Sequence, residues 1–241
     1  YKVFLDGSPQ GRTAWMSEPY EGDNAYCGYP IHTDEALRGY IELALEKKQQ
    51  LLAHCNGDAA AEQYITQFER VLAETGTTNL HRAVMVHAQL VRKDQLQRMA
   101  AIGMIPSFLW HIRIIGVTSI YRISERDGEA GVSPVKDAID LGMKSTFHQD
   151  TPVIPPDMMR TVWSAVNRIS RAGRTIGEEQ RISVLDALKA ITIYAAYQYL
   201  RNRKRKHRMR KYADLLCWIK SAGSSERTAR SDQSEDDDQR K

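Results

Sequence analysis

The feature that most constrains this fold is a short apolar run that ends on a polar side chain and then gives way to a helical pattern. Residues 51–54 end on His54, residues 83–87 end on His87, and residues 144–148 end on His148, shortly before Asp150. Two further apolar runs lie at 1–5 and 104–110. Helical spacing of apolar residues predicts helices at 33–49, 58–75, 93–101, 134–141, 157–171 and 177–199. This alternation predicts a parallel α/β architecture.

The number of strands predicts only part of a closed barrel. A (β/α)8 TIM barrel needs about 250 residues of core elements, and this chain of 241 residues shows five strand candidates. We therefore predict a partial (β/α)8 barrel, its second half, over residues 1–199. Residues 200–241 are predicted to form a basic and then low-complexity tail that is disordered.

Composition bears on where in the cell the protein is expected and on whether it spans a membrane. No apolar run approaches the roughly 18 residues that a membrane span needs, and the first residues resemble no secretory signal. Three cysteines, widely spaced and without a Cys-x-x-Cys pair, favour a reduced cytoplasmic setting. The chain opens in a strand-like run without an initiator methionine, which indicates a fragment. Open barrel edges in such a fragment predict self-association.

Charge is concentrated near the end of the chain. The net charge is +4, and residues 200–211 carry eight Lys or Arg in twelve positions, followed by an acidic stretch at 234–238. Such a run is able to bind nucleic acid or another polyanion. It lacks interleaved aromatic residues, so we expect a solvated helical extension or tail and no nucleic-acid partner.

His54 and His87 end successive strands of the predicted sheet. In a barrel such positions converge on one mouth, where imidazoles can share a metal ion. The alternative is two unrelated histidines, one capping a strand and one hydrogen-bonded in the core, and spacing alone leaves both open. Gly57 permits a tight turn after the strand, and Asp58 is placed to cap a helix and to orient a ligand histidine.

Three more side chains are candidates for the site. Asp150 is the predicted catalytic acid–base, because a carboxylate beside a divalent ion can take a proton from water and return it to a leaving nitrogen. Its alternative is an N-cap for the next helix. His148 is predicted to bind substrate or support Asp150, or else to be a buried residue with a backbone partner. Lys2 either faces water near the terminus or is partnered or carboxylated at a metal site.

Several motifs resemble the amidohydrolase family 3 branch (YtcJ-like) of the metal-dependent amidohydrolase superfamily. The resemblance runs from residue 1 to about residue 199, and four strand-end motifs fall in the family's order. The matching segments are residues 2–8 (KVFLDGS), 54–58 (HCNGD), 86–89 (VHAQ) and 146–153 (TFHQDTPV), with weaker matches at 156–158, 163–168 and 187–192.

This resemblance implies a barrel of the metal-dependent hydrolase type, one or two divalent ions, usually zinc, and a small amide-like substrate whose non-peptide C–N bond is hydrolysed. His54 and His87 match metal ligands, and Asp150 matches the general base at the metal. Lys2 matches a lysine that in some members is carboxylated and bridges two ions.

Three departures from the family's pattern keep competing hypotheses open. The family's His-x-His pair lies upstream of anything present here, residues 110–129 do not follow the pattern, and the basic run stands where sandwich strands are expected. The first hypothesis is a metal-dependent amidohydrolase, impaired by truncation. The second is a non-catalytic fragment of one, and the third is a polyanion-binding protein that acts through its basic tail.

Overall fold

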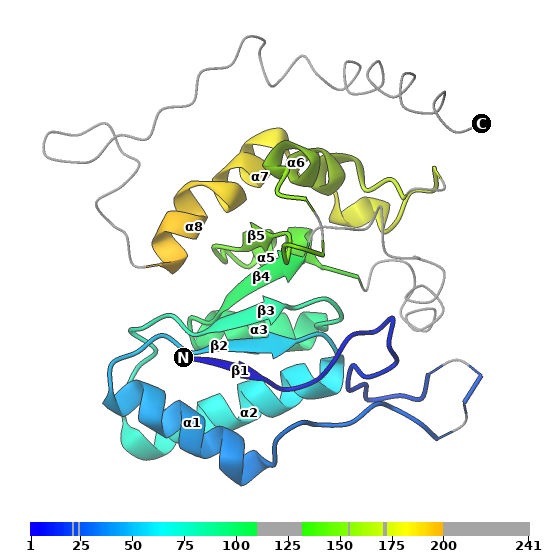
Figure 1. The fold of residues 1–241 in the computed structure, drawn as a ribbon. Helices are drawn as coiled ribbons and strands as arrows, with labels where there is room; N and C mark the ends of the chain where they lie inside the picture. The colour runs from blue at the N-terminus through cyan, green and yellow to red at the C-terminus, as the bar shows by residue number, and fades with distance from the viewer. Residues whose placement is uncertain (21, 24, 110–131, 154, 171–172, 200–241) are drawn as a thin grey trace, which may run out of the picture. The chain divides into compact units, whose positions relative to one another are not determined.

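The computed structural model describes residues 1–20, 22–23, 25–109, 132–153, 155–170 and 173–199 (Figure 1). The unmatched stretch at 110–129 and the tail at 200–241 lie outside the described residues, so the predictions made for them remain predictions. Five strands form one sheet: β1 (Lys2–Phe4), β2 (Leu52–Cys55), β3 (Val84–His87), β4 (Ile105–Leu109) and β5 (Thr146–His148).

The order of the strands identifies the kind of α/β fold. Neighbours in the sheet are neighbours in the sequence, β1-β2-β3-β4-β5, and every pairing is parallel. A doubly wound sheet would reverse its order at a switch point, whereas a barrel adds strands in sequence. Because all strands run the same way, their carboxyl ends lie together at one end of the sheet. Three candidate residues, His54, His87 and His148, lie at these strand ends, and Asp150 lies just beyond β5, whereas Lys2 is the first residue of β1.

Helices connect and flank the strands, as Figure 1 shows. Helix α2 packs on β2, and α7 and α8 pack on β5. Thr33 caps α1, its side chain accepting a hydrogen bond from Ala36 N, and Asp157 caps α6 in the same way through Arg160 N. The helices are α1 (Asp34–Glu46), α2 (Asp58–Thr75), α3 (Lys93–Ala101), α5 (Val135–Asp140), α6 (Met158–Asn167), α7 (Val184–Ile191) and α8 (Ile193–Gln198), with a 3-10 turn η2 (Glu178–Gln180).

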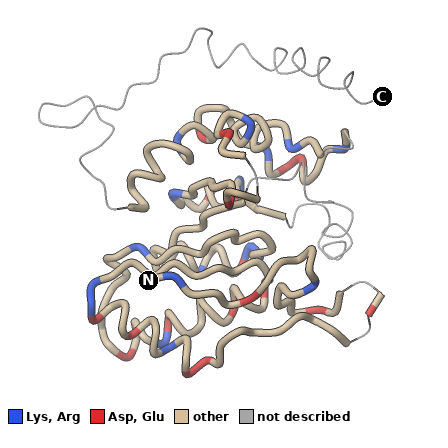
Figure 2. Tube along the Cα trace, viewed as in Figure 1, with Lys and Arg blue, Asp and Glu red and all other residues tan. Residues whose placement is uncertain are grey.

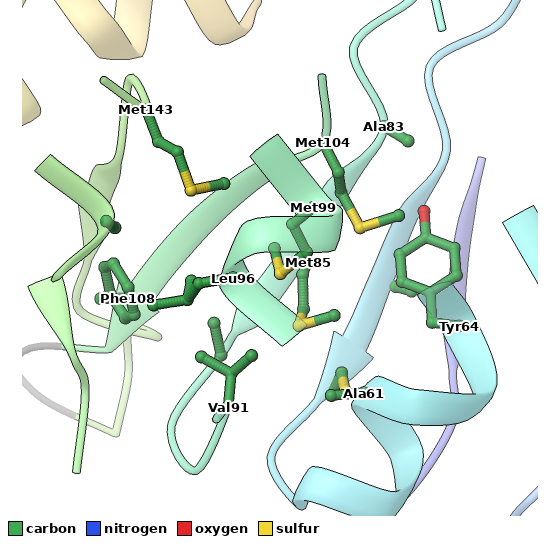
Figure 3. Packing of buried hydrophobic residues seen from close by; sticks show 14 of the residues in the cluster. Ala61, Tyr64, Ala83, Met85, Val91, Leu96, Met99, Met104, Phe108 and Met143 are labelled. Atoms are coloured by element: carbon green, nitrogen blue, oxygen red, sulfur yellow. The ribbon is translucent and has the colours of Figure 1, made fainter. Parts of the chain in front are cut away.

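The larger of two hydrophobic clusters among the described residues contains side chains of the sheet and of these helices. Its centre is rich in methionine, with Met85 on β3 close to Met99 of α3 and to Met104, as Figure 3 shows. Tyr64 of α2 and Phe108 of β4 supply large rings to the same cluster. Flexible thioethers fill irregular gaps between rigid aromatic and branched side chains. The core thus fixes the strand ends that carry the site.

Proline 106 lies inside β4, where a residue without an N–H would normally break a sheet. Pairing of β4 with β5 begins only at Ser107, which lies opposite Thr146. Pro106 therefore precedes this ladder and sits near the start of the strand, where a residue without an N–H is tolerated.

The predicted helix over 177–199 is wrong as a single element. Ser183 accepts a hydrogen bond from Asp186 N and starts α7 there, after the 3-10 turn. Thr192 has φ −124° and ψ −88°, outside helical geometry, and separates α7 from α8. No helix of the described residues has the length and apolar character needed to cross a bilayer.

Candidate functional site

Three histidines from three strands meet at the carboxyl edge of the sheet. The rings of His54 and His87 have centroids 4.4 Å apart, and those of His87 and His148 are 4.9 Å apart. Nε2 of His148 lies 3.1 Å from Nδ1 of His87. Residues separated by up to 94 positions therefore share one small region. The rings of His54 and His87 are therefore neighbours, and their sharing of a metal ion stays a prediction.

The backbone of β3 changes direction at its last residue. His87 has φ 75° and Ala88 has φ 45°, both in the left-handed region that side-chain-bearing residues seldom adopt. In register, His87 pairs with Cys55, whose thiol is buried in the core. The ring of His87 instead contacts His54 and His148. Left-handed backbone at such residues costs free energy and is concentrated at functional sites.

Burial keeps two of these imidazoles uncharged. Burial, followed by the nearby His148, His54 and Lys2, lowers the pKa of His87 to about 2. The pKa of His148 is lowered to about 4, again first by burial and then by Lys2 and His54. Both rings are therefore neutral at pH 7. A neutral imidazole is the form that can bind a metal ion.

The contacts of Lys2 and His148 bear on the two roles that the sequence leaves open for each: a place in the site, or an ordinary structural position. Lys2 is exposed on β1, with Nζ 5.1 Å from the centroid of the Phe4 ring, and its charge acts on both His87 and His148. Its positive charge thus lowers the pKa of both histidines while its side chain stays exposed to solvent. His148 Nδ1 lies 3.0 Å from Ser107 Oγ, so within the described ranges its two ring nitrogens contact side chains and not the backbone.

Asp150 lies just beyond β5 and is exposed. It has a left-handed backbone, φ 53°, and its carbonyl accepts a hydrogen bond from Val153 N at 2.9 Å. Helix α6 is capped by Asp157 instead, so the interpretation of Asp150 as a helix cap does not hold. Asp150 is thus an exposed acid at the same edge as the three histidines.

Asp6 is the polar contact of His54 that the sequence analysis missed. Its Oδ1 lies 3.2 Å from His54 Nδ1. The sequence suggested Asp58 for this place, but Asp58 accepts hydrogen bonds from Ser17 and Arg92. Asp6 lies in an Asp-Gly-Ser-Pro stretch that is typical of a turn, so no local pattern pointed to it.

The histidines have the donor atoms that a divalent ion needs, and two of them have the neutral form. Among the described residues, the number of ligand side chains grouped together is smaller than a catalytic zinc requires. Imidazole nitrogens suit zinc, and two of the rings are held neutral. A catalytic zinc takes three protein ligands. Within the described ranges, no three or more His, Cys, Asp or Glu side chains are grouped so as to hold an ion. The described residues therefore offer part of a ligand shell.

Comparison with known proteins gives two similar sequences. The chain is 29% identical over 203 residues to "Putative amidohydrolase YtcJ" of Bacillus subtilis (strain 168), covering 79% of this chain and 36% of that protein. It is 21% identical over 202 residues to "N-substituted formamide deformylase" of Arthrobacter pascens, covering 81% of this chain and 36% of that protein. The chain thus spans just over a third of the length of these curated relatives.

Two solved structures share the fold. Both are uncharacterized metal-dependent hydrolases, one from Pyrococcus horikoshii OT3 with 28% sequence identity and one from Pyrococcus furiosus with 25%. Each has a TM-score of 0.70 and covers 84% of this chain and 40% of its own. The partial α/β barrel predicted from the sequence is confirmed. The sequence model of the "Amidohydrolase family" matches residues 1–232, and the chain belongs to that family.

Proposed function

We propose that this chain forms part of a metal-dependent hydrolase site that cleaves a non-peptide C–N bond in a small amide-like substrate. In this proposal His54, His87, Asp150 and Lys2 hold a divalent metal, zinc being the one that imidazole donors favour. Asp150 is the general base, and His148 binds the substrate. The observation that carries the proposal is the meeting of neutral His87 with His54 at the carboxyl edge of the sheet.

The relatives support the class of reaction. The name of the Arthrobacter pascens protein gives deformylation of an N-substituted formamide, which is cleavage of a C–N bond. The two Pyrococcus structures are named as metal-dependent hydrolases. When bound, a divalent ion would polarise the substrate carbonyl and lower the pKa of a water molecule.

The chain's own residues would then bind the substrate and move protons. An exposed carboxylate at the position of Asp150 can take a proton from the attacking water and return it to the leaving nitrogen. His148, whose two ring nitrogens contact Ser107 and His87, would exchange one of these contacts for a hydrogen bond between its neutral ring and the substrate. Lys2 would join the ligand shell as a carboxylated side chain, because a protonated amine has no lone pair for a metal ion.

Metal analysis and hydrolysis assays of the full chain test this proposal. After dialysis against zinc, we expect bound zinc in the wild-type chain and hydrolysis of an N-substituted formamide. Asp150→Ala should lower the turnover rate by about 10²–10⁴-fold, the usual contribution of a general base. Asp140→Ala is the matched control, since Asp140 is an exposed acid of α5 that pairs with Lys136.

A second candidate is a non-catalytic member of the family. It is favoured by the incomplete grouping of ligand side chains within the described part of the chain. The two candidates give opposite results in the same assay. A wild-type chain that binds no zinc and hydrolyses no amide or formamide would retire the first candidate and support the second.

A further inference from the structure

The contact between His87 and His148 passes over a strand of the sheet. His87 ends β3 and His148 ends β5, and β4 lies between these two strands. Neighbouring strands lie about 4.8 Å apart, so in a flat sheet β3 and β5 would be separated by roughly 10 Å. The two ring nitrogens are only 3.1 Å apart. Side chains stand roughly perpendicular to a sheet, so this short contact indicates that the sheet curves around β4.

Pairing between strands does not by itself fix this curvature. In the described sheet β5 pairs on one side only, with β4. The rotation between paired strands varies from roughly −10° to −35° among sheets. An end strand therefore needs further contacts to hold one angle relative to β3.

Gln198, the last residue of α8, links two strands that are not neighbours. Its backbone carbonyl accepts a hydrogen bond from Gln50 Nε2 at 2.7 Å, and its side-chain Oε1 accepts one from Thr146 Oγ1 at 2.6 Å. Gln50 lies two positions before β2, and Thr146 is the first residue of β5. In Figure 1 the carboxyl end of α8 lies on the side from which the strands start. Gln198 is buried there and joins the amino ends of β2 and β5.

Tyr197 contacts the starts of β3 and β5. Its carbonyl accepts a hydrogen bond from Arg82 Nη1, and the Arg82 guanidinium carbon lies 3.6 Å from the centroid of its ring. A guanidinium over an aromatic face is attracted to the ring quadrupole. Arg82 lies two positions before β3, and Lys144, two positions before β5, places Nζ 4.4 Å from the same centroid. Tyr197 and Gln198 thus contact the starts of the three strands that end on the histidines of the site.

We propose that Tyr197 and Gln198 form a clamp on the amino ends of β2, β3 and β5 and act as positioning residues, which set the angle across β4 at which His148 meets His87. The clamp acts through the strands, from the end of the sheet opposite the histidines. The ring contact needs no ligand, so this inference goes beyond the proposed function. Only its consequence for zinc binding rests on that function.

The first measurement uses the metal-free wild-type chain. An NMR cross-peak between the ring protons of His87 and His148 reports their contact, with the rings assigned through His87→Gln and His148→Gln. Ring-current shifts of the Arg82 side chain report its stacking on Tyr197. We expect both signals, and a wild-type chain that lacks either one overturns the proposal.

The second measurement compares two pairs of substitutions in the full chain. Thr146→Val removes the hydroxyl that reaches Gln198 and nearly keeps the shape of the side chain, whereas Thr146→Ser keeps the hydroxyl. Tyr197→Leu removes the ring beside Arg82, whereas Tyr197→Phe keeps a ring there. Thr146→Val combined with Tyr197→Leu should abolish the histidine cross-peak in the folded chain. Thr146→Ser combined with Tyr197→Phe should retain it.

Thr66→Val is the control for general loss of stability. It removes a hydroxyl of α2 that donates to Glu62 at 3.1 Å, and it should retain the histidine cross-peak. An unchanged cross-peak in the folded Val and Leu variant overturns the proposal, and so does an equal loss in Thr66→Val. If the combined variant does not fold, Thr146→Val compared with Thr146→Ser decides, with a weaker cross-peak expected only in Thr146→Val.

Zinc binding separates this proposal from the proposed function. The Val and Leu variant should bind zinc about 10–100-fold more weakly than the Ser and Phe variant, the usual effect of losing a contact that orients a ligand. If the wild-type chain binds no zinc while the cross-peak depends on the clamp, the metal function fails and the clamp stands. If the wild-type chain binds zinc while the Val and Leu variant keeps the cross-peak, the clamp is overturned and the metal function stands.

Discussion

His87 and His148 make the stability of the folded chain depend on pH. Their pKa values in the folded state are about 2 and about 4, below the ordinary value of 6.5. Below pH 6.5 the unfolded chain therefore binds protons that the folded chain does not, so acid favours unfolding. Each histidine should remove up to about 1.4 kcal/mol of stability per pH unit between pH 6.5 and its folded pKa.

Urea unfolding of the metal-free chain at pH 7 and pH 5 measures this loss. His148→Gln removes one titrating group and retains a side chain able to bond with Ser107, so its stability should fall less between the two pH values than that of the wild type. An equal fall in both proteins would show that His148 is readily protonated in the folded state.

Single residues show how far a sequence can predict a site. His54, His87 and His148 were recognisable because each ends an apolar run, and strand ends of one parallel sheet converge. Asp6 was not recognisable in this way. Its partners Asn56 and Gly57 are 50 and 51 positions away, and only the pairing of β1 with β2 brings them together.

At the level of elements, short apolar runs bounded by turn residues predicted every described strand, because their length and flanking residues suit strands buried on both faces of a parallel sheet. It failed at the helices after residue 177. Apolar residues continue at helical spacing through the break at Thr192, so the pattern carries no sign of it. At the interruption the hydroxyl of Thr192 donates a hydrogen bond to the Leu188 carbonyl, a local contact that the spacing of apolar residues does not report.

Ser183 should stabilise the start of α7. Its hydroxyl oxygen accepts from Asp186 N at 3.1 Å, which satisfies one of the free N–H groups of the first turn. Ser183→Ala should lower the free energy of unfolding by about 1 kcal/mol. Ser183→Asp keeps an acceptor at the cap and should lose less, and thermal or urea unfolding of the two variants compares them. Equal losses would assign the effect to something other than capping.

For the molecule as a whole, charge is mixed over the described part of the chain. Figure 2 shows Lys and Arg interspersed with Asp and Glu, and several form pairs, such as Arg98 with Glu69 and Arg92 with Asp58. The polyanion-binding hypothesis therefore depends on residues 200–211, which lie outside the described residues. Its test remains binding of a polyanion at increasing salt, with and without residues 200–241.

The edges of the sheet lead to the final prediction, self-association. In the described sheet β1 pairs on one side only, with β2, and carries exposed side chains of Tyr1 (53%) and Phe4 (48%). Leu5 N donates to the His54 carbonyl on the β2 side, so by strand alternation Phe4 N points to the open side. An edge with free N–H groups and exposed aromatic rings favours pairing with another chain.

Sedimentation velocity over a range of concentrations tests this edge directly. We expect the wild-type chain to associate and Phe4→Lys to shift it toward monomer, because an edge lysine opposes strand pairing. Leu80→Lys is the control, since Leu80 is 74% exposed but lies in the turn between α2 and β3. A wild-type chain that is monomeric at every concentration contradicts the prediction. Equal dissociation by Leu80→Lys would instead assign association to general surface hydrophobicity, because that substitution leaves the β1 edge unchanged.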